Sequence, residues 1–252
     1  MALPKISVPT YDLTIPSTKE KIKVRPFSVK EEKLLLIALE SENMGEIADT
    51  VKQVINNCII KGEVDVDKLP FFDIDYMFIF LRAKSVGESV EVKMTCNNIV
   101  EGNKCGEIFD ADMDINKCEI LYQEDVKDDI KLDKDKGVKM KYPSYAAMRK
   151  LESNPIDAKT DIIIQSIEYI YDKKGVYPAR DHSREELTEF IEGLTEANYK
   201  KLEKFVSSFP TFAVLLEKKC PKCGFHHKVR YTDFYDFFFL IMGYQRLAAE
   251  AR

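Results

Sequence analysis

Residues 220–225 read Cys-Pro-Lys-Cys-Gly-Phe, and this short motif decides how the rest of the chain is expected to fold. Two cysteines separated by two residues and followed by glycine are typical of a zinc knuckle. In this turn both sulfurs are directed at one point while backbone N–H groups bind them. One such pair supplies half of a tetrahedral metal site, so the other half must come from elsewhere in the chain.

We expect Cys96 and Cys105 to supply that other half, because Lys104-Cys105-Gly106 repeats the end of the first motif between two predicted strands. Eight residues separate Cys96 from Cys105, where two to four are usual, so Asn97–Lys104 is interpreted as an insertion in the knuckle. The entropy cost of closing so long a loop grows only logarithmically with length. Binding of a structural zinc ion supplies on the order of 10 kcal/mol of folding free energy, which can offset this entropy cost. The sequence therefore predicts a zinc site at these four cysteines.

Two other interpretations of these cysteines stay open. The four could be reduced thiols that pack as small hydrophobic residues. Cys220 and Cys223 could instead form a redox dithiol, although no thioredoxin-like strand and helix surround them. His226 or His227 could replace a cysteine as ligand, but four cysteines already complete a tetrahedron. The two remaining cysteines, Cys58 and Cys118, are expected to be packing residues.

Composition places the chain among ordinary globular proteins. Of its 252 residues, 45% are hydrophobic and 32% charged, and the net charge of −5 does not favour nucleic acid. Its first residues lack the apolar core of a secretory signal. The longest apolar stretch, Phe234–Met242, is far shorter than the roughly 20 residues of a membrane-spanning helix. We therefore expect a protein of the cytosol, where cysteines stay reduced or bind metals.

Hydrophobic periodicity predicts strands and helices along the whole chain. Alternating residues predict a hairpin of Tyr11–Ile15 with Lys21–Arg25, and strands at Val90–Met94, Glu107–Ala111, Asp129–Leu132, Val138–Tyr142, Phe212–Leu216 and Lys228–Tyr231. Helical spacing predicts helices at Val29–Glu40, Ile47–Ile60, Asp73–Lys84, Tyr145–Leu151, Ala158–Asp172, Arg184–Ile191, Glu196–Ser207 and Asp233–Ala249. Capping boxes are expected at Ser28 with Glu31 and at Ser183 with Glu186, and Gly137 is expected to supply a positive φ in a tight turn.

These elements predict an α+β fold. An N-terminal hairpin and helices, a central β region and a C-terminal helical region would be joined by a four-cysteine site that resembles a zinc ribbon. Residues 1–142 would contain the first knuckle, and residues 143–252 would be mainly helical and contain the second knuckle. Because the cysteines connect these two regions, we expect one integrated fold.

Cations surround the second knuckle. No acid occurs from Lys218 to Arg230, and the cations are Lys218, Lys219, Lys222, Lys228 and Arg230. Such a patch could bind nucleic acid, as in zinc ribbons. We favour the alternative that it offsets the charge of four thiolates and keeps the hairpin soluble, because no arginine and aromatic interleaving extends it.

No catalytic motif stands out. The chain lacks a phosphate-binding glycine loop, a dinucleotide fingerprint, a His-Glu-x-x-His helix and a nucleophile elbow. In Arg82-Ala-Lys-Ser-Val-Gly-Glu88, the cations are expected to complement a helix C-terminus that Gly87 ends. We therefore expect no enzymatic activity and no small-molecule substrate.

The last predicted helix has an apolar stripe that extends over more than one face. Burial within the chain would satisfy it, and so would a partner protein. Its candidate partner-binding residues are Phe234, Phe237, Phe238, Ile241 and Tyr244.

The chain resembles the baseplate hub assembly proteins of T-even-type contractile-tailed phages. The resemblance rests on Met1-Ala-Leu-Pro-Lys5, on Val24-Arg-Pro-Phe-Ser-Val-Lys-Glu-Glu-Lys-Leu-Leu-Leu36 and on the string from Arg82 to Glu88, and it extends to the terminal helix. It implies a role in building the baseplate hub, with other hub or tail proteins as partners, no membrane and no catalytic residues.

The resemblance leaves the protein's fate open. It could stay in the virion's tail baseplate or act in the host cytoplasm during assembly. The order of hairpin, capping box and helix is also similar to tail assembly chaperones of long-tailed phages, which keeps a transient role open. A zinc-ribbon protein that binds nucleic acid is the alternative from another class, and a salt-dependent shift in a DNA-binding assay would reveal it.

Overall fold

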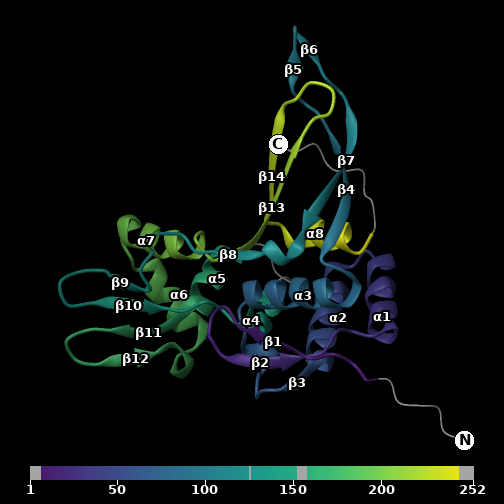
Figure 1. Cartoon of the computed structure of the whole chain (residues 1–252). Helices are drawn as coiled ribbons and strands as arrows, with labels where there is room; N and C mark the ends of the chain where they lie inside the picture. The colour runs from purple at the N-terminus through teal and green to yellow at the C-terminus, as the bar shows by residue number, and fades with distance from the viewer. Residues whose placement is uncertain (1–6, 125, 152–157, 244–252) are drawn as a thin grey trace, which may run out of the picture. The chain divides into compact units, whose positions relative to one another are not determined.

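The computed structural model describes residues 7–124, 126–151 and 158–243 of the chain (Figure 1). Contacts divide the chain into two compact units. The first contains Met1–Val66, Phe72–Leu121 and Thr211–Arg252, and the second contains Asp67–Phe71 and Tyr122–Pro210. Both cysteine pairs fall in the first unit. The sequence-based division into residues 1–142 and 143–252 stays a prediction.

The helices and strands confirm the predicted α+β class. In the first unit they are β1 Tyr11–Thr14, β2 Lys21–Val24, α1 Val29–Glu40, α2 Met44–Cys58, β3 Ile59–Lys61, α3 Phe71–Val86, β4 Ser89–Thr95, β5 Ile99–Val100, β6 Asn103–Lys104, β7 Ile108–Asp114, the 3₁₀ helix Ile115–Lys117, β8 Glu119–Leu121, β13 Thr211–Lys219, β14 His226–Tyr231 and α8 Phe234–Ile241. In the second they are β9 Asp129–Lys131, β10 Gly137–Met140, α4 Tyr145–Leu151, α5 Ala158–Ser166, β11 Ile167–Tyr171, β12 Val176–Pro178, the 3₁₀ helix Ala179–Asp181, α6 Arg184–Glu192 and α7 Glu196–Val206. A 3₁₀ helix, Val66–Lys68, lies where the two units meet in sequence, and α3 begins with Phe71 of the second unit.

The N-terminal hairpin is joined to the helices through a buried carboxylate. Glu31 completes the predicted capping box by accepting hydrogen bonds from the Ser28 amide (2.6 Å) and hydroxyl. It also accepts from Nη2 of Arg25, at 2.8 Å, and the same guanidinium nitrogen donates to the carbonyl of Asn57 at the end of α2. Because Arg25 directly follows β2, its guanidinium connects the hairpin to α1 through an ion pair and to α2 through a hydrogen bond.

This arrangement predicts how stability depends on pH. The hydrogen bond from Arg25 is the main cause that lowers the pKa of Glu31 to about 2, from an ordinary value of 4.5. A carboxylate with a lowered pKa stabilises the fold above its ordinary pKa, and that contribution is lost as the pH falls from 4.5 toward 2. Glu31→Gln should therefore lower the free energy of unfolding at pH 7 by about 1–3 kcal/mol.

The difference between wild type and Glu31→Gln should shrink in acid, as measured by urea unfolding at several pH values. Glu40→Gln is the matched control, because Glu40 is exposed at the end of the same helix and should change stability little at any pH. A difference that stays constant between neutral and acid pH would contradict the assignment.

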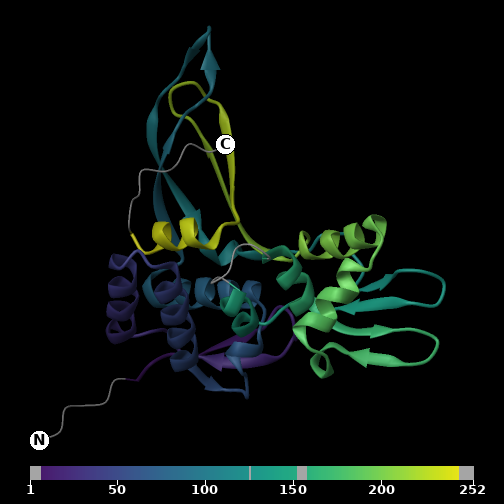
Figure 2. The same ribbon diagram turned by 180° about the vertical axis from the view of Figure 1, so that it is seen from behind.

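An aromatic cluster in the core of the first unit lies where α3 packs against α8 (Figures 1 and 2). Phe78 of α3 contacts Phe238 of α8, with ring centroids 5.2 Å apart, and Phe212 of β13 contacts Phe237 at the same distance. Arg82 is buried, and its Nε donates to the carbonyl of Ile241 at 2.8 Å while Nη1 donates to that of Gly87. Arg82 therefore lies at the end of its own helix, as the sequence predicted, and also caps the C-terminus of α8, which the sequence pattern did not indicate.

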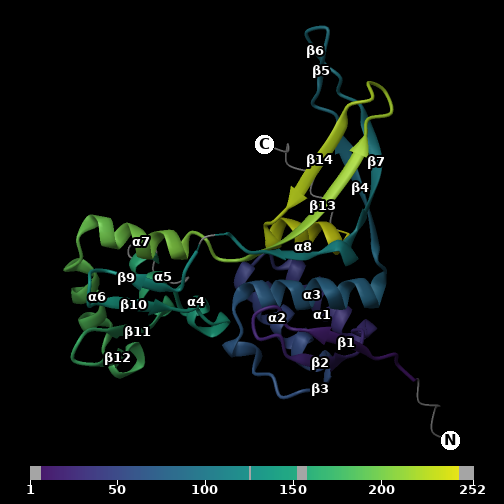
Figure 3. The same ribbon diagram turned by 60° about the vertical axis from the view of Figure 1, so that its left-hand side comes forward.

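Two antiparallel hairpins, β4–β7 and β13–β14, form an extension of the first unit that is called the arm below (Figure 3). Val90, Val92 and Met94 of β4 are buried, and the residues between them are exposed. The same alternation continues in β7, and β7 packs against β13. Both hairpins therefore bury one face against the other and expose the opposite face.

In the part of the second unit that the structure describes, helices α4 to α7 pack with a sheet ordered β12-β11-β10-β9. The predicted helix Ala158–Asp172 is wrong in its second half, because α5 ends at Ser166 and Ile167–Tyr171 forms β11. The hydroxyl of Ser166 donates to the carbonyl of Ile162 in the last turn of the helix, and β11 then pairs with β10. The C-terminal region predicted to be mainly helical thus also contains four strands, β11 to β14.

Three local predictions are corrected. Gly137 lies in β10 and does not have the predicted positive φ. A Cβ at this position would lie 2.2 Å from the hydroxyl oxygen of Tyr171, so close packing against Tyr171 explains why the residue is glycine. The helix predicted from Ile47 to Ile60 runs from Met44, capped by Asn43, to Cys58, and Ile59 begins β3. α8 begins at Phe234 rather than at the predicted Asp233, because Asp233 is its N-cap.

The length predicted for the last helix is also corrected. A helix over Asp233–Ala249 was expected, but α8 ends at Ile241 and Gly243 has a φ of +82°. A positive φ is unfavourable for a helix and is easily adopted by glycine. Residues 244–252, including Tyr244, lie outside the described residues.

Candidate metal centre

The four cysteines predicted as ligands come together in the arm. The sulfur atoms of Cys96, Cys105, Cys220 and Cys223 all lie within 4.8 Å of one another. The Sγ atoms of Cys96 and Cys223 are 3.6 Å apart, and those of Cys105 and Cys220 are 3.9 Å apart. A Zn–S bond of about 2.3 Å in a tetrahedral site separates the sulfurs by about 3.8 Å. The two distances fit that geometry, and both are much longer than the roughly 2.05 Å of a disulfide.

Both pairs of cysteines make the same backbone hydrogen bonds. The amide of Cys96 donates to the carbonyl of Glu107 (2.7 Å), as that of Cys220 donates to the carbonyl of Phe225 (2.8 Å). Glycine follows the second cysteine of each pair, and the amides of Gly106 and Gly224 donate to the carbonyls of Cys96 and Cys220, both at 3.0 Å.

The glycines of the two turns also share a backbone conformation. Gly106 has a φ of +68° and Gly224 a φ of +73°. These positive values favour glycine over residues with a Cβ. The two turns are therefore equivalent zinc knuckles in backbone geometry.

Backbone amides also bind the sulfurs directly. The amides of Asn98, Glu107 and Phe225 each hydrogen-bond the sulfur of the cysteine two residues earlier. Such N–H···S bonds orient thiolate ligands and reduce their negative charge. The same turn that brings the sulfurs together thus prepares them to bind a cation.

The insertion predicted between Cys96 and Cys105 is a small hairpin at the end of the arm (Figure 3). Ile99 pairs with Lys104 and Val100 with Asn103, so β5 and β6 are joined by the two residues Glu101 and Gly102. Both have positive φ, at +50° and +84°, which is typical of a type I′ turn. The extra residues therefore form a separate hairpin and leave the knuckle geometry unchanged.

Two side chains that were not predicted as ligands also contact the sulfurs. Nε2 of the buried His227 lies 3.2 Å from Sγ of Cys96, and the side-chain amide Nδ2 of Asn98 donates to Sγ of Cys223 at 3.7 Å. When Cys96 is a thiolate, Nε2 of His227 is the donor. The sequence indicated His227 only as a possible substitute ligand, because its proximity to Cys96 depends on how β14 packs against β7.

The electrostatics of the four thiols differ from one another. Burial raises the pKa of Cys96 to about 12, whereas the hydrogen bond from the Phe225 amide is the main cause that lowers the pKa of Cys223 to about 6. Four thiolates this close repel one another, and a divalent cation at their centre would remove that repulsion. The donor set therefore fits a soft, tetrahedral metal ion such as zinc.

The remaining cysteines lie outside the cluster. Cys58 is buried and Cys118 is half-buried, and burial raises the pKa of Cys58 to about 11 and that of Cys118 to about 12. Neither belongs to the group of sulfurs that could hold a metal ion. Both have the properties of the packing residues predicted from the sequence.

Two of the five cations around the second knuckle, Lys222 and Lys228, have acidic or carbonyl partners in the fold. Nζ of Lys228 lies 2.7 Å from Glu217, and Nζ of Lys222 donates to the carbonyl of Cys105 at 3.3 Å while lying 4.0 Å from Glu107. Lys222 thus connects one knuckle to the other. Glu217 and Glu107, which lie outside the run from Lys218 to Arg230 in the sequence, therefore neutralise part of its positive charge in the folded protein.

The candidate partner-binding residues of α8 lie mostly in the core. Phe237, Phe238 and Ile241 are at most 1% exposed, and Phe234 is half-buried. Burial within the chain was the alternative to a partner surface, and a role of α8 in binding another protein stays a prediction. Within the described part of the chain, no helix has both the length and the apolarity needed to cross a membrane.

Comparison with known proteins gives one match. The sequence model of the family described as T4 bacteriophage base plate protein matches residues 8–239, which include all four clustered cysteines and most of α8. No curated protein and no solved structure matches the chain. The chain therefore belongs to the T4 bacteriophage base plate protein family.

Proposed function

We propose that this protein is a non-enzymatic component of the baseplate hub, which acts through contacts with other hub or tail proteins and is stabilised by one zinc ion. Membership of the base plate family makes it a phage baseplate structural protein.

The proposal that the protein binds one zinc ion is supported by the cluster of four sulfur atoms. Its sulfur separations fit a tetrahedral site, and the two knuckles that form it are far apart in the sequence. Cys96, Cys105, Cys220 and Cys223 would hold the ion. Zinc has no redox chemistry, and a site with four protein ligands has no open coordination position. Such a site would therefore join the two hairpins and would not activate a substrate.

The assignment of the protein to the baseplate hub is supported by its resemblance to hub assembly proteins, and the residues that carry this resemblance have structural roles. Arg25, Ser28 and Glu31 make the ion pair and the capping box that join β2 to α1. Arg82 caps α8, and Ser85 accepts a hydrogen bond from the amide of Phe27. These residues stabilise the first unit, which is why the proposal carries over no catalytic role from them.

The location of the protein is tested by mass spectrometry of purified virions and of infected-cell lysate. We expect the chain in virions, in a constant ratio to other baseplate proteins. Abundance in lysate together with absence from virions would instead identify a transient assembly chaperone that acts in the host cytoplasm. The first result would identify a component of the virion, and the second would identify a chaperone that acts only during assembly.

Nucleic-acid binding is the competing function, based on the cations around the second knuckle. Because these cations are partly neutralised by Glu217 and Glu107, we expect no salt-dependent shift of DNA by the zinc-loaded protein. A shift that weakens steeply with salt and is abolished by Lys222→Glu would favour the competing function.

A further inference from the structure

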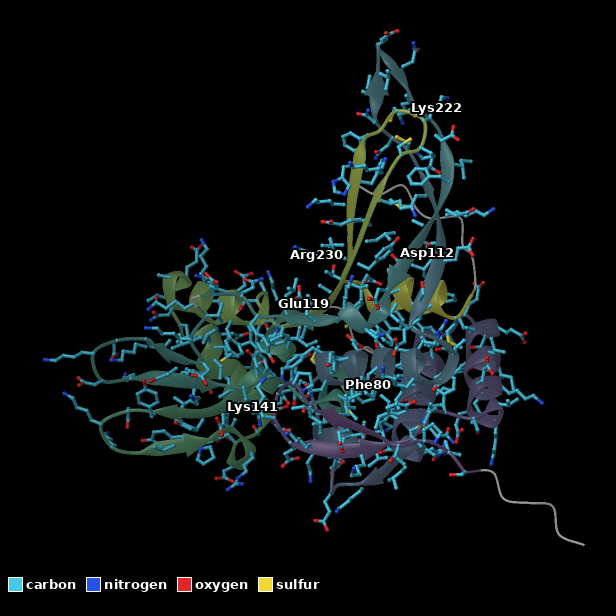
Figure 4. All side chains as sticks on the ribbon, viewed as in Figure 1. Phe80, Asp112, Glu119, Lys141, Lys222 and Arg230 are labelled. Atoms are coloured by element: carbon cyan, nitrogen blue, oxygen red, sulfur yellow. The ribbon has the colours of Figure 1, made fainter. Side chains whose placement is uncertain are left out.

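The two hairpins of the arm expose faces of opposite charge. On β4 and β7 the exposed charged residues are Glu91, Asp110 and Asp112 with Lys93, a set called the acidic arm face below. On β13 and β14 the exposed charged residues that share the side of Leu215 are Lys219, Lys228 and Arg230 with Glu217, called the basic arm face. In Figure 4, Asp112 and Arg230 lie on the two sides of the arm at similar heights.

The acidic arm face lacks enough cations of its own. Glu91 and Asp112 lie directly opposite each other on paired strands, and like charges in this arrangement destabilise a sheet. Lys93 lies opposite Asp110 and is the one cation of the face. Among the described residues, neither Glu91 nor Asp112 takes part in an ion pair within 4 Å. This face would therefore gain stability from cations supplied by another chain.

The basic arm face has the complementary property. Glu217 neutralises Lys228, at 2.7 Å, whereas within the described part of the chain Lys219 and Arg230 have no carboxylate within 4 Å. Arg230 lies directly opposite Leu215, which is 44% exposed. An arginine beside an exposed apolar side chain is typical of protein–protein interfaces.

The two faces cannot neutralise each other within one chain. Their hairpins bury their other faces against each other, with the rings of Phe109 and His227 5.7 Å apart between them. The cysteine cluster joins the same hairpins near the end of the arm. The acidic and basic faces are therefore held on opposite sides of one unit, and a second copy of the chain offers each face its complement.

From this geometry we infer that the acidic arm face of one copy binds the basic arm face of another. The interface is head-to-tail, so repeated contacts produce a ring or an open chain of copies. The inference deepens the proposed function, on which it rests, by naming one protein partner of the baseplate component as a second copy of itself.

Sedimentation velocity of the zinc-loaded full-length protein tests the inference. At about 50 mM salt we expect assemblies larger than a monomer that grow with protein concentration, and at about 500 mM we expect these to dissociate, since salt screens exposed charges. A protein that stays monomeric at every concentration and salt overturns the inference.

Charge reversal identifies the faces. Glu91→Lys with Asp112→Lys makes both faces basic, and Lys219→Glu with Arg230→Glu makes both acidic. Each double variant should lose self-association, with a dissociation constant raised at least about tenfold. Equal amounts of the two double variants should associate, and so should the chain that carries all four changes, because opposite faces are complementary again. Circular dichroism and zinc content check that each variant is folded.

Two further outcomes contradict the inference. Double variants that associate as the wild type does would assign self-association to another surface. A monomeric wild-type protein whose charge-reversed variants fail to enter virions would assign the faces to a different baseplate protein. The second outcome leaves the proposed function intact, whereas absence of the wild-type chain from both virions and hub intermediates would refute the proposed function itself.

Discussion

Cys220→Ser should abolish tight metal binding and destabilise the first unit more than any other single change. The variant leaves three thiolates for a site that takes four. A structural zinc ion contributes on the order of 10 kcal/mol, which is comparable to the whole stability of an ordinary domain, about 5–15 kcal/mol. Loss of the ion also leaves three sulfurs close together without a cation.

Elemental analysis of protein purified without added metal should find one zinc per chain in the wild type and little in Cys220→Ser. Hydrogen exchange should then increase most in the arm, over residues 89–114 and 211–231. Cys118→Ser is the matched control, because Cys118 lies outside the sulfur cluster. This variant should contain as much zinc as the wild type. Full metal content and unchanged stability in Cys220→Ser would refute the metal site, and iron in place of zinc would correct the identity of the ion.

Phe238→Ser should have the second largest effect. Phe238 is fully buried, and its ring lies 5.2 Å from that of Phe78 and 5.8 Å from that of Phe234. Removing a buried phenyl ring costs about 3–5 kcal/mol, and serine adds a hydroxyl that must find a hydrogen-bond partner. We expect a loss of this size in urea unfolding and precipitation near physiological temperature.

Ile37→Ser is the control for this change, because Ile37 is 64% exposed on α1 and its replacement should alter stability by less than about 0.5 kcal/mol. A Phe238→Ser protein that stays folded and zinc-loaded but fails to co-purify with hub proteins would support the predicted partner role of α8. Normal stability together with normal assembly would contradict both the core and the partner interpretations.

The sequence predicted well those parts of the fold that depend on neighbouring residues. The capping boxes at Ser28 and Ser183 are present, and α1 and α4 have their predicted bounds. The cysteine cluster was also predictable although its halves are distant, because each half carries a local signal, cysteine followed by glycine. The physical reason is that caps and knuckles are stabilised by hydrogen bonds within a few residues.

Elements decided by distant contacts were missed. Ile167–Tyr171 continues the apolar spacing of α5, and only pairing with β10 makes it a strand. The positions of His227 beside Cys96 and of Arg82 at the end of α8 likewise depend on packing between separate elements. No spacing rule within a short window carries that information, since β10 lies about thirty positions before β11 and the partners of His227 and Arg82 are more than a hundred positions away.

The position of the two knuckles in the chain also affects the order in which the protein is made. Cys105 and Cys220 are 115 positions apart, and the second unit is encoded between them except for Asp67–Phe71. At 5–20 residues per second, a ribosome needs about 6 to 23 seconds to synthesise that segment. During this interval Val92 and Phe109 of the first hairpin lack the β13–β14 hairpin that later covers them. The nascent first unit therefore exposes the apolar face of the β4–β7 hairpin until residues 211–231 emerge from the ribosome.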